Sequence, residues 1–211
     1  MVYVSSLPDD RTARARIRDE ALRLFAERGP DAVTVRDIAT AAAVSPALVV
    51  RHYASKDGLR SAVDDYVASV FEVLLAQVVE PARGGALDPD VLPSLAELVA
   101  AQLPTGSPVP GYLGRLLLTG GPVGSALFAR LHVAARDALT ALVRTGAAIP
   151  GTDPAVRAAF LLVNDLAVVI LRDRLREVLG IDPLSDTGLR RWGAEVLAIY
   201  GGGLAAPVRP G

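Results

Sequence analysis

The stretch TVRDIATAAAVSPALVVRHYASKDGLR, residues 34–60, decides the fold, because three helix starts follow one another within it. Thr34 stands three residues before Asp37 in a capping box, in which each side chain bonds to the backbone of the other residue. Ser45, followed by a proline, and Ser55 are typical residues at the N-terminus of a helix. The sequence therefore predicts three closely spaced helices that share one small core.

The connection between the first two of these helices lies within residues 39–43 and leaves about four residues of turn. Two short helices joined so tightly must cross steeply and bury a common core. This is helix-turn-helix geometry, predicted over about residues 34–53. The expected core residues are Val35, Ile38, Ala39, Val44, Val49 and Tyr53.

Helices are expected in almost all of the remaining chain, because apolar residues recur at steps of three and four and no segment alternates at period two. The first helix covers about residues 10–28 and ends at a Gly-Pro pair. The helix that begins at Ser55 is expected to run to about residue 79. Further helices are predicted near 90–103, 112–119, 123–148, 153–179 and 185–200. The predicted fold class is all-α, with about nine helices.

The composition limits the possible functions. There is no cysteine, and His52 and His132 are the only histidines, so disulfides, thiolate zinc sites and cysteine nucleophiles are excluded. No pattern places a nucleophile beside a base, so neither an enzyme, a cofactor nor a metal site is expected. No signal peptide is recognised, and the longest apolar stretch, residues 158–171, is too short to cross a bilayer. A cytoplasmic protein with no membrane partner is expected.

The net charge of −1 hides an asymmetry. Residues 1–60 carry ten Arg or Lys against eight Asp or Glu, whereas the remainder carries twelve against fifteen. The N-terminal part is therefore slightly basic, which favours local phosphate contacts over broad polyanion binding. Four of its basic residues lie within eight positions: Arg11, Arg14, Arg16 and Arg18.

Residues 34–60 closely resemble the DNA-binding signature of the TetR family of bacterial regulators, and the preceding ALRLFAERG, residues 21–29, resembles that family too. The resemblance covers about residues 11–71, and the remaining chain is similar only in layout. It implies a DNA-binding domain at 11–71 and a ligand-sensing and dimerisation domain at 72–203. The last two helices would be the dimerisation pair.

The resemblance also implies which residues face DNA. The recognition helix would span residues 45–53, with Val49 and Tyr53 toward the core. Arg51 would read a guanine, with Arg36 as the second candidate. Thr34, His52 and Lys56, the only lysine, would contact phosphate. The expected DNA-binding residues are Thr34, Arg36, Ser45, Pro46, Ala47, Leu48, Val50, Arg51, His52 and Lys56.

The run Ala47 to Val50 is more apolar than is common in the family. It favours contact with thymine methyl groups over hydrogen bonds, and it loses the aromatic phosphate contact expected where Val50 stands. The operator sequences of relatives therefore do not predict the operator of this protein.

Polar residues in the later helices are candidates for a ligand pocket. Asn164 and Asp165 interrupt the most apolar helix and either line a pocket or fix register at a dimer interface. Tyr112 and Arg115 could orient a ligand, although Arg115 could equally pair with an acid. His132 lies four residues before Arg136, and a solvated helix face is the favoured interpretation of that pair.

Together these features predict a ligand-responsive regulator. It would bind a palindromic operator in double-stranded DNA as a homodimer, act as a repressor, and respond to a small apolar effector. The alternative is a small-molecule binding or scaffold protein with a vestigial helix-turn-helix. That alternative predicts no sequence-selective DNA affinity.

Overall fold

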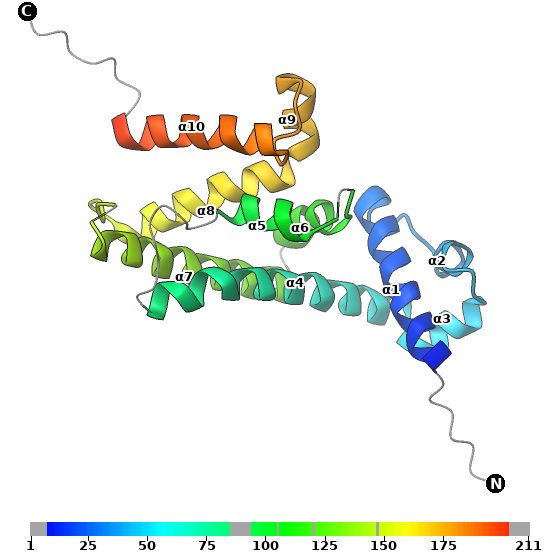
Figure 1. Ribbon diagram of the computed structural model, residues 1–211. Helices are drawn as coiled ribbons and strands as arrows, with labels where there is room; N and C mark the ends of the chain where they lie inside the picture. The colour runs from blue at the N-terminus through cyan, green and yellow to red at the C-terminus, as the bar shows by residue number, and fades with distance from the viewer. Residues whose placement is uncertain (1–7, 85–93, 105, 120, 147, 203–211) are drawn as a thin grey trace, which may run out of the picture.

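The computed structural model describes residues 8–84, 94–104, 106–119, 121–146 and 148–202. In these residues helices are the only regular secondary structure, which confirms the predicted all-α class. A small head of three helices lies at one end of an elongated helical body (Figure 1). The helices are α1 (Pro8–Arg28), α2 (Val35–Ala41), α3 (Pro46–Tyr53), α4 (Lys56–Gly84), α5 (Leu95–Gln102), α6 (Val109–Leu118), α7 (Pro122–Arg144), α8 (Pro154–Ile170), α9 (Arg172–Leu179) and α10 (Asp186–Gly202).

Helix α4 joins the head to the body. It begins directly after the head and then runs alongside α7, its main packing partner in the body (Figure 1). Its buried residues Leu59, Val63, Phe71 and Leu74 all lie in one continuous core. The expected division between residues 71 and 72 therefore falls inside an unbroken helix.

The prediction of one helix over residues 153–179 is wrong. The chain bends by 75° between α8 and α9, at Leu171. The bend brings Arg172 to Asp182, with Nε donating to Oδ1 at 2.9 Å. Periodicity could not reveal the bend, because both segments are helical and neither Gly nor Pro stands at the junction. The described residues thus form ten helices rather than about nine.

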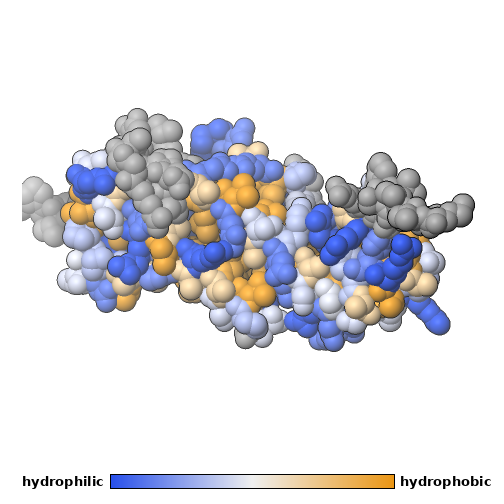
Figure 2. Space-filling model, turned by 90° about the horizontal axis from the view of Figure 1, so that it is seen from below, coloured by the Kyte–Doolittle hydropathy of each residue, from blue (hydrophilic) through white to orange (hydrophobic). Residues whose placement is uncertain are grey.

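Polar and apolar residues are mixed on the molecular surface. In the face shown in Figure 2, hydrophilic residues cover much of the surface, and apolar residues reach it in separate patches. Within the described residues no single helix has both the length and the apolar character needed to cross a membrane. Two bent helix pairs meet those limits only when their members are taken together.

Candidate functional site

The three predicted helix caps of the head are confirmed. The Thr34 hydroxyl accepts the Asp37 N–H at 3.2 Å, and the Asp37 carboxylate accepts the Thr34 N–H at 2.8 Å. The Thr34 hydroxyl also donates to the Asp37 carboxylate at 2.7 Å, and this bond, together with that from the Thr34 N–H, holds the pKa of Asp37 below its ordinary value. Ser45 and Ser55 each accept, through Oγ, the N–H of the residue three positions on, at 3.2 and 3.0 Å. The starts of α2, α3 and α4 are therefore fixed locally.

Helix α3 is locked against α1 by its buried face. Val49 and Tyr53 are 1% and 7% exposed, as the sequence predicted. The Tyr53 hydroxyl donates to the carbonyl oxygen of Arg14 at 2.7 Å, and the Arg14 guanidinium lies 5.3 Å from the centre of the Tyr53 ring. Sequence reasoning missed this contact because its partners are 39 positions apart. Helix α3 thus has a defined orientation in the head.

The opposite face of α3 is open to solvent. Arg51 is exposed there, and Val50 keeps 47% of its surface exposed although it is apolar. Arg36 is exposed on the neighbouring helix α2, and Thr34 is exposed at its start. The predicted DNA contacts on α3 divide by exposure into Ser45, Pro46, Ala47, Val50 and Arg51, which are exposed, and Leu48 and His52, which are half-buried. That these residues contact DNA remains a prediction.

Lys56 has a structural partner that the sequence did not reveal. Its ammonium donates to the carbonyl oxygen of Val33 at 3.1 Å, which ties the start of α4 to the turn before α2. An ammonium has three N–H donors, so the same group can still bind a phosphate. The phosphate contact of Lys56 remains a prediction.

Tyr112 and Arg115, two of the candidate pocket residues, lie on α6 at the junction between body and head. The Tyr112 hydroxyl donates to Asp64 Oδ1 at 2.5 Å, and its ring stacks on Phe25 with 6.5 Å between centres. Burial raises the pKa of both Tyr112 and Asp64. Arg115 Nε donates to the carbonyl oxygen of Ala26 in α1 at 3.2 Å. Asp64, Tyr112 and Arg115 line a cavity of about 260 Å³ that lies between head and body.

A larger cavity of about 400 Å³ lies deeper in the body, between α4, α5, α7, α8 and α10. Asn164 and Asp165 both line it, so the structure places these two candidates together. His132 is not among its lining residues, and His132 Nε2 lies 3.1 Å from the carbonyl oxygen of Ala155. Sequence reasoning did not identify Glu97 or Trp192, which also line the cavity.

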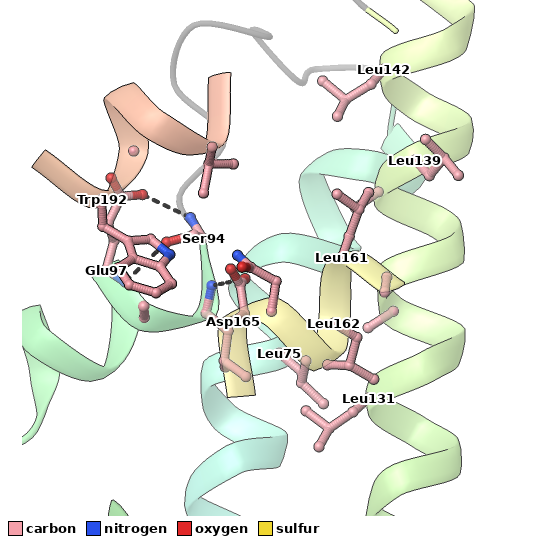
Figure 3. A pocket seen from close by; sticks show the side chains of 18 of the residues that line it. Leu75, Ser94, Glu97, Leu131, Leu139, Leu142, Leu161, Leu162, Asp165 and Trp192 are labelled. Carbon is pink, nitrogen blue, oxygen red and sulfur yellow. Dashed lines mark hydrogen bonds between the residues drawn. The ribbon is translucent and has the colours of Figure 1, made fainter. Parts of the chain in front are cut away.

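Asp165 is the central polar group of this cavity (Figure 3). Its Oδ2 accepts the N–H of Leu95, the first residue of α5, at 3.0 Å. Burial raises the pKa of Asp165 to about 6; the hydrogen bond from Leu95 opposes that rise, and the charge of Glu97 adds to it. Glu97 itself is held by Ser94 in a capping box at the same helix start.

Known protein families match both the N-terminal and the C-terminal part of the chain. The family described as bacterial regulatory proteins, tetR family, matches residues 17–63, and the tetracyclin repressor-like C-terminal domain matches residues 106–206. The HTH-type transcriptional regulatory protein RaaS of Mycobacterium tuberculosis is 37% identical over 74% of this chain and 68% of RaaS. The HTH-type transcriptional repressor Rv3405c of the same organism is 46% identical over 29% of this chain and 32% of that protein.

Among solved structures, the fold is similar to that of SmeT, the repressor of the Stenotrophomonas maltophilia multidrug efflux pump SmeDEF. The TM-score is 0.65 at 20% identity, with 96% of this chain and 98% of SmeT covered. At this identity the likeness shows the fold alone. With a matching head, a matching C-terminal domain and the extended similarity to RaaS, the chain belongs to the TetR family of helix-turn-helix transcriptional regulators.

Proposed function

We propose that the protein is a repressor that binds a palindromic operator as a homodimer and leaves it when a small effector binds in the body. The observation that carries this proposal is the head. Helix α3 is capped at its start, anchored to α1 through Tyr53, and exposed on the face that holds Arg51. A rigid helix with one such face fits the major groove. Because its target is chromosomal, the protein is expected to act in the cytoplasm.

Within the head, Arg51 and Lys56 are assigned different roles. Arg51 is exposed, and its guanidinium can bond to guanine O6 and N7 together, which discriminates one base pair. Lys56 is half-buried at the start of α4 and offers a point charge to phosphate, which is the same for every sequence.

An apolar stripe on α8 supports the homodimer. Val156, Phe160 and Val163 follow one another at steps of four and three, so they share one face of the helix. They are 64%, 61% and 53% exposed in the single chain. Large apolar side chains gathered on one exposed face mark an interaction surface. We propose that α8 and α10 pack against their two-fold mates as a four-helix bundle, which sets the two heads about 34 Å apart, or one turn of DNA.

The effector would act through α4. Leu75 of this helix lines the larger cavity, and Lys56 at its start is bonded to the head. A ligand that fits the cavity better when α4 is displaced favours a spacing of the heads that does not match the operator. Coupling of this kind amounts to about 1–3 kcal/mol. Helix α6 provides a second connection, because Arg115 bonds directly to α1.

Two substitutions test the DNA-binding roles. Once an operator has been obtained by selection, the affinity of Arg51→Ala and Lys56→Ala is measured by fluorescence anisotropy on that operator and on single base-pair variants. Arg51→Ala is expected to lose about 1–3 kcal/mol of discrimination at one base pair, whereas Lys56→Ala weakens all duplexes alike. Arg174→Ala removes an exposed arginine on α9 and serves as the control. Identical behaviour of the two head variants would contradict the assignment.

A further inference from the structure

The two ends of the larger cavity differ in chemistry. Leucines of α7 and α8 form one wall, whereas polar side chains gather at the other end, where α5 begins (Figure 3). The leucines of that wall are Leu131, Leu139, Leu142, Leu161 and Leu162. A volume of about 400 Å³ is suited to a small organic molecule. The cavity is therefore shaped for a ligand with an apolar body and one polar end.

The polar end carries two carboxylates and no basic group. Asp165 and Glu97 both line the cavity, and among its described lining residues there is no Lys, Arg or His. Asp165 binds the Leu95 N–H through Oδ2, while Oδ1 has no hydrogen-bond donor within the described part of the chain. Asp165 is half-buried, and a carboxylate partly removed from water without a positive partner attracts a cation that can reach it.

Trp192 adds a second and independent feature at the same end. Its indole Nε1 is buried and has no hydrogen-bond partner among the described residues. The ring lies beside Ser94 and Glu97 in Figure 3. A protonated amine has no acceptor for this N–H, so what Trp192 offers to a cation is the face of its ring. An aromatic ring beside carboxylates is, in addition, a favourable surface for an organic cation.

We propose that the effector of this protein is an amphiphilic cation, whose apolar body packs on the leucine wall and whose protonated amine binds Asp165 beside Trp192. This inference rests on the proposed function, since it names the chemical class of effector for the same cavity. The carboxylates exclude effectors that end in a carboxylate or phosphate, because like charges in a partly desolvated cavity repel strongly. Asp165 serves in this account as an effector-binding residue, and its bond to Leu95 holds the carboxylate in place.

The chain provides its own reporter, because Trp192 is the single tryptophan. The full-length protein at pH 7.5 is titrated with decylammonium, decan-1-ol and decanoate, which share an apolar chain and differ in charge. Tryptophan fluorescence gives the three dissociation constants. We expect decylammonium to bind at least tenfold more tightly than decan-1-ol, and decanoate to bind more weakly than the alcohol. Decanoate binding as tightly as the amine would overturn the proposal.

Asp165→Asn separates charge from structure, because its amide oxygen can still accept the Leu95 N–H. This variant is expected to lose the tenfold preference for the amine while its affinity for decan-1-ol changes less than twofold. Asp173→Asn removes an equal charge from the exposed helix α9 and should retain the preference. Retention of the preference in Asp165→Asn would refute the role of that residue.

Operator binding is measured in parallel, so that a failure of the proposed effector class can be distinguished from a failure of the proposed regulator function. If none of the three probes binds while the protein still binds its operator, the cation proposal fails and the regulator proposal stands. If the amine binds and no operator can be selected, the regulator proposal fails instead.

Discussion

Replacing Asp165 by Asn should stabilise the protein at neutral and alkaline pH. Burial raises the pKa of this carboxyl from 3.8 to about 6, so the folded protein holds the proton more tightly than the unfolded chain does. The contribution of Asp165 to stability is therefore most favourable below pH 4 and is lost as pH rises toward 6. Asn keeps an acceptor for Leu95 and cannot ionise, so the variant escapes that loss.

The magnitude follows from the two pKa values. A pKa difference of one unit between the folded and unfolded states corresponds to about 1.4 kcal/mol of stability. The difference between 3.8 and about 6 therefore corresponds to about 3 kcal/mol. The free energy of unfolding of Asp165→Asn, relative to the unsubstituted protein, should rise by about 2–3 kcal/mol between pH 4 and pH 8.

Urea unfolding followed by far-UV circular dichroism measures this difference at each pH. The protein concentration is kept fixed, because dimerisation makes stability depend on it. Asp173→Asn controls for the change in net charge. A difference between Asp165→Asn and the unsubstituted protein that is constant from pH 4 to pH 8, or that falls as pH rises, would refute the account of Asp165.

Three further substitutions test other parts of the structure. Gly58→Ala would place its Cβ against the carbonyl oxygen of Tyr53, so urea unfolding should show a loss of about 1–3 kcal/mol; unchanged stability would contradict the tight turn between α3 and α4. Ala43 has a left-handed φ of 52°, so Ala43→Gly should raise the free energy of unfolding by about 1 kcal/mol, and a loss would show that the turn is not strained. Phe160→Glu should yield monomers in analytical ultracentrifugation, whereas a dimer of undiminished stability would place the interface elsewhere.

The head was predictable because its determinants are local. Capping of α2 depends on residues only three positions apart, Thr34 and Asp37, and the buried spacing of Val49 and Tyr53 follows from helical periodicity. The contact of Lys56 with Val33 and that of Tyr53 with Arg14 connect residues 23 and 39 positions apart. Such contacts depend on how helices pack, which spacing along the chain does not specify.

The body was predictable only in part. Asn164 and Asp165 stood out because they interrupt an apolar helix, and they do line the larger cavity. Tyr112 and Arg115 were grouped with them, although packing places both at the junction with the head. A single tryptophan on a late helix was the available signal for Trp192, but only the fold brings it beside Glu97 and Asp165.

The central claim, that the head reads a specific DNA sequence, is tested most directly by selection from random duplexes with the purified protein at moderate salt. The account predicts enrichment of a palindrome whose half-sites lie about one helical turn apart, with an affinity that falls as salt rises. Failure to enrich any palindrome would contradict the account, and a binding or scaffold protein with a vestigial helix-turn-helix would then fit better.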